Sequence, residues 1–181
     1  CGTGYFSNMA QEQGACVTGL DASEGLLKAA QKRNTEITFV MGEMEELPFK
    51  AGTFDMVCGF NSYQYAANFS NALFQARKVL KTKGRLVLMI WGNKIDCEAR
   101  TYLKALGGLL PPPPPNTILG GPFALSENKL LEKTLDEVGF KILKTDDVPA
   151  IWDYPDIDTA LKGLLSAGPV AKAIENSSFE Q

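Results

Sequence analysis

The residues best suited to bind a ligand stand at the start of the chain, where residues 1–7 predict a glycine turn that opens a helix. Gly2 and Gly4 let the backbone come close to a ligand, and the first turn of a helix offers free N–H groups. The same residues would also fit a simple tight loop without a ligand. A dinucleotide-binding fingerprint places a third glycine where Ser7 stands, so Ser7 weighs against NAD without excluding it.

A carboxylate follows the next apolar run. Asp21 ends the strand expected at residues 15–20 and stands seventeen residues after Gly4. At that position a carboxylate accepts hydrogen bonds from both hydroxyls of a ribose. The alternative is structural, because Asp21 and Glu24 also form the D-x-x-E pattern of a capping box. With the glycine turn ahead of it, we favour the ribose role for Asp21.

Two further acidic positions stand beside the expected strands, one just after the second strand and one at the start of the third. Glu43 would lie at the edge of the same crevice, where a carboxylate can bind the edge of an adenine, or it belongs to a solvated acidic run. We interpret Asp55 as structural, because it opens a strand and can accept from backbone donors at the turn.

The elements that position these residues alternate in type along the first half of the chain. Continuously apolar runs separated by amphipathic helices indicate a parallel sheet covered on both faces. The expected strands are residues 15–20, 37–41, 54–60 and 86–91, and the expected helices are residues 23–33 and 69–80. We therefore predict an α/β fold with a doubly wound, mostly parallel sheet and helices on both faces.

The second half is less regular. The expected elements are helices at 97–106, 125–138, 156–165 and 170–174, a strand at 140–148 and an extended proline run at 111–115. Ser126 is the expected N-cap of the second of these helices and Gly139 its C′ residue. We interpret the proline run as a stiff spacer beside a lid; no basic flank supports an SH3-type ligand.

Composition excludes several function classes. The 181 residues contain no histidine, which excludes Ser-His-Asp and Cys-His hydrolases within this chain. A net charge of −3 argues against a nucleic-acid partner, and no apolar run reaches the roughly 20 residues that span a bilayer. The basic residues at 77–85 fit the end of a helix better than a nucleic-acid surface.

The four cysteines are widely spaced, at Cys1, Cys16, Cys58 and Cys97. This spacing fits neither a zinc site nor a disulfide framework, so we expect no metal. Cys16 and Cys58 stand in apolar runs and are expected to be reduced core residues, which favours a cytoplasmic protein.

Five segments in order resemble the successive motifs of class I S-adenosylmethionine-dependent methyltransferases. They are residues 1–6, 17–23, 42–49, 53–57 and 77–88, and the branch most similar to them is the small-molecule type of ubiquinone and menaquinone biosynthesis. The resemblance implies a Rossmann-like cofactor-binding core at residues 1–93. Residues 94–181 would then form a helical lid and acceptor region of the same domain, with the strand near 140–148.

The resemblance also implies roles for individual residues. Gly2 and Gly4 would contact the methionine part of S-adenosylmethionine, and Asp21 would bind its ribose, with Ala22 and Ser23 beside it. Glu43 and Met44 would flank the adenine. Asn61 and Ser62 would lie near the departing methyl group, or they end a strand and cap a loop. No catalytic residue is assigned.

Three departures from the family pattern stand out. The family's first strand and its acidic residue would precede Cys1, and its last strand would follow Gln181. Glu43 replaces the more usual aspartate, and residues 82–84 replace a Pro-Gly-Gly turn. We therefore expect a fragment truncated at both ends.

The implied activity is methyl transfer to a small-molecule acceptor by in-line displacement, without nucleic-acid or membrane partners. The aromatic residues Trp91, Tyr63, Tyr65, Trp152 and Tyr154 either line a hydrophobic acceptor pocket or belong to the core. Two alternatives remain: a non-catalytic or truncated methyltransferase-like fragment, and an NAD(P)-dependent oxidoreductase.

Overall fold

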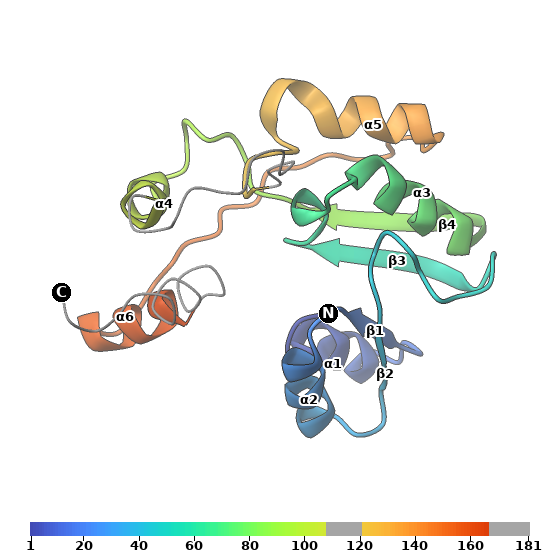
Figure 1. The fold of residues 1–181 in the computed structure, drawn as a ribbon, viewed down its shortest axis with the longest axis horizontal. Coiled ribbons are helices and arrows are strands. Elements are labelled where there is room, and N and C mark those ends of the chain that lie inside the picture. Colours follow the sequence, from blue (N-terminus) through green and yellow to red (C-terminus); the bar gives the residue numbers. More distant parts are fainter. Residues whose placement is uncertain (108–120, 167–181) are drawn as a thin grey trace. The chain divides into compact units, whose positions relative to one another are not determined.

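The structure is a computed structural model that describes residues 1–107 and 121–166 of the 181-residue chain. Its first helix, α1 (Tyr5–Glu12), leads into a strand–helix–strand unit of β1 (Thr18–Asp21), α2 (Glu24–Arg33) and β2 (Thr38–Met41). A loop then leads to β3 (Phe54–Phe60), the short 3₁₀ helix η1 (Tyr63–Tyr65), α3 (Phe69–Val79) and β4 (Leu80–Met89) (Figure 1).

All described strand pairs are parallel. β1 pairs with β2 from Thr18↔Thr38 to Asp21↔Met41, and β3 pairs with β4 in register from Met56↔Arg85 to Phe60↔Met89. Within the described residues these pairs are two separate two-stranded sheets, because β3 pairs with β4 and not with β1. The predicted α/β class is therefore confirmed, but the strands described here do not join into one continuous sheet.

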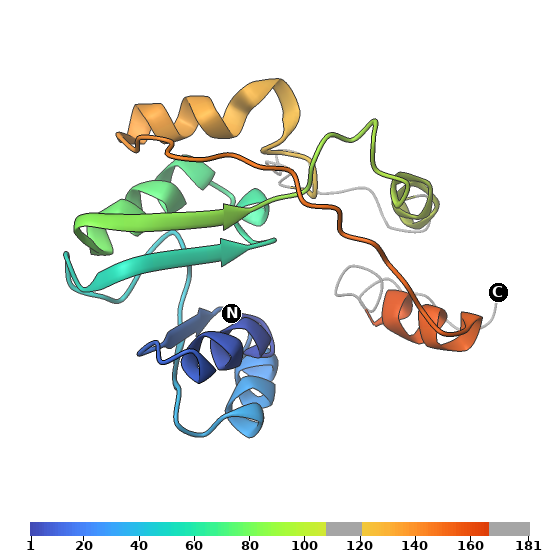
Figure 2. The ribbon, with the colours of Figure 1, turned by 180° about the vertical axis from the view of Figure 1, so that it is seen from behind.

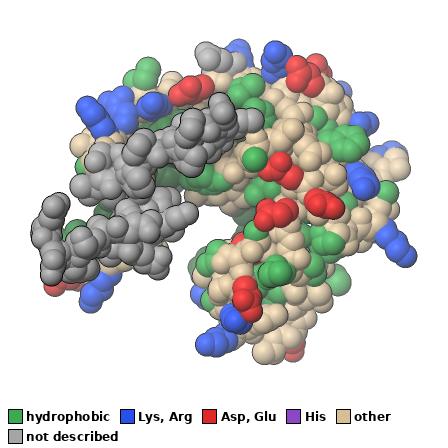
Figure 3. Space-filling view, viewed as in Figure 1, with side chains coloured by type: hydrophobic (Ala, Val, Ile, Leu, Met, Phe, Trp, Pro, Cys, Tyr) green, Lys and Arg blue, Asp and Glu red, His purple; other side chains and the backbone are tan. Residues whose placement is uncertain are grey.

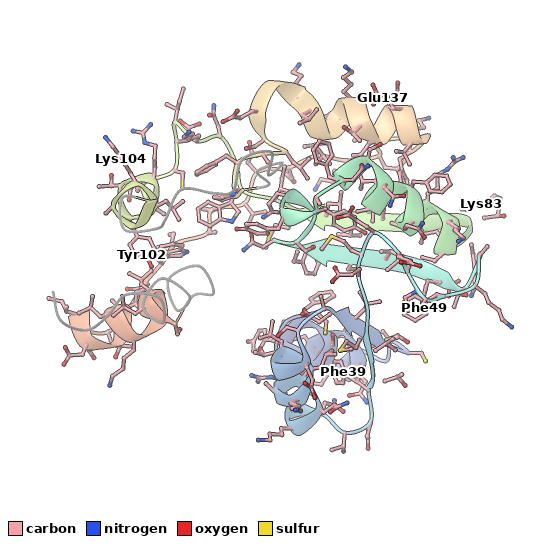
Figure 4. The ribbon with its side chains drawn as sticks, viewed as in Figure 1. Phe39, Phe49, Lys83, Tyr102, Lys104 and Glu137 are labelled. Carbon is pink, nitrogen blue, oxygen red and sulfur yellow. The ribbon has the colours of Figure 1, made fainter. Side chains whose placement is uncertain are left out.

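The first pair packs against α2 through a small core. Leu27 and Ala30 of α2 are buried, together with Ile37 just ahead of β2. Phe39 of β2 reaches back to the start of the chain, where a Cβ on Gly4 would stand 3.1 Å from its ring (Figure 4). This contact fixes the glycine turn against β2.

The second pair carries the larger core. Buried Ala72, Leu73, Ala76 and Val79 share one face of α3, as the three- and four-residue spacing predicts. Leu73 and Ala76 cluster with Tyr63 and Leu125, and α5 (Leu130–Val138) lies alongside α3 in both ribbon views (Figure 2).

The chain divides into two compact units. Of the described residues, 1–93 and 121–143 form the first, which includes α5, and 94–107 and 144–166 form the second. The second unit holds α4 (Arg100–Gly107) and α6 (Ile157–Leu165), joined by a 2.7 Å hydrogen bond from the Tyr102 hydroxyl to the Leu164 carbonyl. The predicted boundary at residue 93 coincides with a unit boundary, but α5 packs with the first unit.

Several expected elements differ from the structure. Residues 140–148 form no strand: residues 141–150 are exposed, and no described strand lies beside them to accept their hydrogen bonds. The helix expected at 125–138 begins as a 3₁₀ turn, η2 (Glu127–Lys129), and Ser126 makes no capping hydrogen bond, since its hydroxyl donates to the Phe123 carbonyl. Gly139 ends α5 with a φ of 87°, as predicted.

The helix expected at 156–165 is observed as α6, at Ile157–Leu165. Asp156 caps α6, its side chain accepting from the Thr159 N–H. The proline run at 111–115 and the helix expected at 170–174 lie outside the described residues.

The surface mixes charges of both signs. Lysine, arginine and acidic side chains all appear on the face shown in Figure 3. Cys16 and Cys58, expected in the core, are exposed free thiols; Cys16 lies just ahead of β1 and Cys58 lies in β3. Among the described residues, no helix has the length and apolar character needed to cross a bilayer.

Candidate functional site

The glycine turn folds as the sequence predicts, but its two glycines have different surroundings. Gly2 and Gly4 have left-handed backbones, with φ of 57° and 73°, and the Gly4 N–H closes the turn onto the Cys1 carbonyl at 3.1 Å. A Cβ on Gly4 would stand 2.9 Å from the Ala30 Cβ, so α2 packing requires this glycine. Nothing lies within 4 Å of a Cβ on Gly2, which leaves its backbone open on that side.

Asp21 stands at the carboxyl end of β1 and bonds to the glycine turn. Its Oδ2 accepts from the Gly2 N–H at 2.8 Å and from the Cys1 amino group at 3.0 Å, and its Oδ1 accepts from the Ser23 N–H at 3.0 Å. A carboxylate has about four acceptor positions, so Oδ1 can accept a further donor. The turn and the carboxylate are thus one unit.

Electrostatics keep this carboxylate ionised. Partial burial raises the pKa of Asp21, whereas hydrogen bonds from the Ser23 and Gly2 N–H groups lower it, and the pKa lies below its usual value. The capping-box alternative is wrong, because Ser23 is the N-cap of α2 and accepts from the Leu26 N–H. Glu24 instead pairs with Lys28 at 2.8 Å.

The loop that follows β2 returns to the carboxyl end of β1. The Gly42 N–H donates to the Asp21 carbonyl at 3.1 Å, so Glu43 follows directly beside the end of β1. The Glu43 side chain is exposed, whereas Met44 is half-buried and packs against the core of the second sheet. Ala22 and Ser23 are exposed at the same strand end. The structure thus gathers Gly2, Asp21, Ser23 and Glu43 and separates the Met44 side chain from them.

Asn61 lies at the carboxyl end of β3 and ties it to the end of β4. Its N–H donates to the Met89 carbonyl at 2.8 Å, and its Oδ1 accepts from the Trp91 indole N–H at 2.6 Å and from the Gln64 amide. Asn61 has a φ of 51°, a conformation that asparagine tolerates better than most residues. Ser62 follows, half-buried, and makes no side-chain cap of η1.

One aromatic pair connects the glycine turn and its helix with the region around Asn61. Phe6 of α1 packs edge-on against Phe60, the last residue of β3, with ring centroids 4.4 Å apart. The helix opened by the glycine turn therefore contacts the residue immediately before Asn61.

The aromatic residues expected near an acceptor divide into three groups. Tyr63 is buried against Gly59, where an added Cβ would overlap its ring, so Tyr63 belongs to the core. Tyr65 is exposed, and Trp91 packs edge-on against Phe123 at 5.4 Å. Trp152 packs against Tyr102 at 6.2 Å, and Tyr154 lies against Gly163, both within the second unit.

The remaining charged candidates have structural partners. Asp55 pairs with Lys81 at 2.8 Å, and the ion pair lowers the pKa of its carboxyl, which supports the structural interpretation. Arg77 donates to the Val138 carbonyl at 2.9 Å and so binds the end of α5. Lys83, at the end of β4 labelled in Figure 4, has a φ of 66° at the bulge that precedes the regular pairing. No group of side chains in the described ranges could hold a metal ion.

Two contacts that organise this region escaped the sequence analysis. Glu45 accepts from the Ala67 and Asn68 N–H groups at 2.8 and 3.0 Å, and its carbonyl accepts from the Asn71 amide. Gln64 is fully buried beside Asn61. An acidic residue ahead of a helix can accept hydrogen bonds from the N–H groups at the helix start. The partners of Glu45 lie over twenty residues further along the chain, so the local sequence could not identify them.

Known proteins match this N-terminal part. The family described as methyltransferase domain matches residues 1–88. Malonyl-[acyl-carrier protein] O-methyltransferase of Serratia marcescens is 32% identical over 84 residues, covering 46% of this chain and 33% of that protein. Demethylmenaquinone methyltransferase of Thermotoga maritima is 36% identical over 102 residues, covering 51% of this chain and 44% of that protein.

A solved structure shares the fold. It is a SAM-dependent methyltransferase from Thermotoga maritima, described as a possible histamine N-methyltransferase, with a TM-score of 0.58 at 22% identity. The match covers 78% of this chain and 60% of that one. At this identity the likeness shows the fold alone.

The match covers the parallel strands, the glycine turn and Asp21. Residues 1–88 match the methyltransferase-domain family, and the resemblance predicted from the five motifs is confirmed. The chain spans 33% and 44% of the length of the two curated relatives named above.

Proposed function

We propose that the chain binds S-adenosylmethionine and transfers its methyl group to a small-molecule acceptor. The main observation behind the proposal is the hydrogen bond from the Gly2 N–H to the Asp21 carboxylate. It lies at the carboxyl end of β1 and beside the start of α1. Ligands of open α/β folds bind at this end of the strands. The named activities of the two curated methyltransferases support the choice of reaction.

The residues present fit this cofactor. The open side of Gly2 lets a chain of the ligand pass close to the backbone, and the free acceptor position on Asp21 Oδ1 suits a ribose hydroxyl. We assign the methionine part to Gly2 and Gly4, and the ribose to Asp21, Ala22 and Ser23. The adenine is assigned to Glu43 and to the backbone of Met44, because the Met44 side chain packs against the core of the second strand pair. Asn61 and Ser62 would lie near the methyl group.

Bound S-adenosylmethionine supplies an electrophilic methyl carbon: an electron pair of the acceptor forms the new bond while the bond to sulfur breaks and its electrons stay on sulfur. The chain has to hold the acceptor atom about 3 Å from that carbon and in line with the sulfur. Asp21 stays ionised to anchor the ribose. The acceptor's proton leaves to solvent, and no described residue is assigned as its base. The expected cytoplasmic location stays a prediction.

Calorimetric titration with S-adenosylhomocysteine tests the proposal, with NADH as the competing ligand. We expect S-adenosylhomocysteine alone to bind, and Asp21→Asn to weaken it about 10- to 100-fold, since hydrogen bonds to a charged group contribute about 1.5–3 kcal/mol. Asp55→Asn is the matched control, because Asp55 pairs with Lys81. Binding of NADH in place of S-adenosylhomocysteine would move the chain to the oxidoreductase alternative.

Turnover separates an enzyme from a non-catalytic relative. Formation of S-adenosylhomocysteine from S-adenosylmethionine would be measured with a panel of phenols, carboxylic acids and amines. A chain that binds the product tightly but methylates none of these classes would contradict the catalytic half of the proposal.

A further inference from the structure

The carboxyl end of α2 is bonded to the glycine turn and to the helix that the turn opens. α2 packs against α1, and its last residue, Arg33, donates from Nε to the Thr3 carbonyl at 3.0 Å. Asn34, the C-cap residue, donates from Nδ2 to Asn8 Oδ1 at 2.8 Å and to Gln11 Oε1 at 2.7 Å. Different side chains of α2 therefore hold the turn and the helix that follows it.

Thr3 lies between the two left-handed glycines of the turn, Gly2 and Gly4. The N–H of the Thr3–Gly4 peptide donates to the Cys1 carbonyl at 3.1 Å, and the carbonyl of the same peptide accepts from Arg33. This peptide is therefore bonded on both sides. A glycine has no side chain to limit the rotation of the peptides next to it, so these hydrogen bonds fix how the turn is oriented.

Arg33 also contacts the start of α1. Its guanidinium carbon lies 5.6 Å from the centre of the Tyr5 ring, within the range of cation–π attraction. Tyr5 is the first residue of α1 and follows Gly4 directly. The planar guanidinium can lie over a ring and donate a hydrogen bond at the same time. Arg33 thus contacts the residues on both sides of Gly4.

A basic residue at this position also has a simpler explanation. Lys32 and Arg33 both stand in the last turn of α2, where the helix dipole favours a positive charge. The dipole explains the charge of both residues. It does not explain the two contacts of Arg33 with the turn, and no described contact joins Lys32 to the turn. The pair therefore separates the effect of charge from the effect of contact.

We propose that Arg33 is a positioning residue for the cofactor: through the Thr3 carbonyl it holds the glycine turn in the conformation that receives the methionine part of S-adenosylmethionine. This inference rests on the proposed function, which assigns that part to Gly2 and Gly4. Arg33 acts through the turn and does not itself touch the ligand. Because Asn34 holds α1 separately, loss of the Arg33 contacts should disturb the turn more than the helix.

Calorimetry on the full chain tests the proposal with two probes, S-adenosylhomocysteine and adenosine, which lacks the amino-acid part. Arg33→Met removes the guanidinium and keeps an unbranched side chain. We expect it to weaken S-adenosylhomocysteine about 3- to 10-fold, the effect of one exposed hydrogen bond, and adenosine less than about twofold. Arg33→Lys should recover most of the affinity, because an ammonium group can still donate to the Thr3 carbonyl.

Lys32→Met is the matched control, since it removes a charge from the same turn of α2 and keeps the contacts of Arg33. It should leave the affinity for both probes unchanged, and urea unfolding measures the stability of every variant. A merely structural role of Arg33 would weaken both probes equally in Arg33→Met, or would lower stability without changing either affinity. Either result would overturn the proposal.

The turn can also be observed without a ligand. Nitrogen–proton NMR follows the backbone amides of Gly2 and Gly4, and we expect Arg33→Met, but not Lys32→Met, to shift both resonances. Unchanged resonances in Arg33→Met would overturn the role of Arg33.

Failure of the inference is distinguishable from failure of the proposed function. A wild-type chain that bound no S-adenosylhomocysteine would sink the methyltransferase proposal and this inference with it. A wild-type chain that bound S-adenosylhomocysteine, with the same affinity in Arg33→Met, would overturn this inference alone.

Discussion

Glycines with the same backbone conformation serve two purposes in the turn at the start of the chain. Gly4 is required by packing, since an added Cβ would meet Ala30 and Phe39 at 2.9 and 3.1 Å. Gly2 meets nothing within 4 Å, so packing gives no reason for a glycine there beyond its φ of 57°. A close-lying ligand is the reason that the proposed function supplies.

Replacing Gly4 by alanine should therefore destabilise the fold strongly. We expect Gly4→Ala to lower the free energy of unfolding by about 2–4 kcal/mol, the sum of left-handed strain and overpacking. Gly52→Ala is the control, because Gly52 has a similar φ of 67° and open space around it, and it should cost about 1–2 kcal/mol. Urea unfolding followed by circular dichroism measures both. Equal losses of unfolding free energy in the two variants would mean that α2 shifts to make room for the methyl group of Gly4→Ala.

Among single residues, the sequence predicted those whose roles follow from their spacing along the chain. Asp21 and the glycine turn were identified because a strand end and a helix start stand at fixed offsets in the chain. Gln64 was missed because its burial and its hydrogen bonds arise only when the ends of β3 and β4 come together. Nothing in the local sequence distinguishes it from a solvated glutamine.

The loop between β2 and β3 holds three glutamates with different surroundings. Glu45 accepts from two N–H groups at the start of α3, where a negative charge is also favoured by the helix dipole. Glu43 and Glu46 are exposed. Through Glu45 this loop links the first strand pair to the main helix of the second.

Neutral replacements of these glutamates should separate stability from ligand binding. We expect Glu45→Gln to lower the free energy of unfolding by about 1 kcal/mol, because the amide can no longer accept both N–H groups with full charge. Glu46→Gln should leave stability unchanged. Glu43→Gln should also spare stability but weaken S-adenosylhomocysteine in calorimetry. If Glu45→Gln unfolded no more easily than Glu46→Gln, the contact would contribute nothing to holding α3.

Two elements with a strong local pattern were predicted almost to the residue, whereas the strand expected at 86–91 is observed as β4 at Leu80–Met89. β3 spans Phe54–Phe60 as expected, and α3 ends one residue before the predicted end at Leu80, where β4 begins without a loop. The strand expected at 140–148 failed for a non-local reason. Its alternating pattern is compatible with a strand, but a strand also needs a neighbour, and no described strand lies beside it.

On the scale of the whole molecule, the site residues all belong to the first unit, which also carries the match to the methyltransferase family. The second unit has its own contacts, such as the Tyr102–Leu164 hydrogen bond and the Tyr102–Trp152 pair. The connection from the first unit to α6 passes through residues 141–150, all exposed. We therefore expect the segment that joins the two units to be less stable than the units themselves.

Hydrogen exchange measured by mass spectrometry tests this division. Amides of residues 141–150 should exchange at rates near those of an unstructured peptide, since no described strand accepts their hydrogen bonds. Amides of α3 should be the most protected, because that helix buries Leu73 and Ala76 completely. α5, immediately ahead of the segment, is the internal control and should show helical protection. Protection extending through residues 140–148 would show that the segment pairs as a strand, and the original sequence prediction would then describe the molecule better than the exposed connection does.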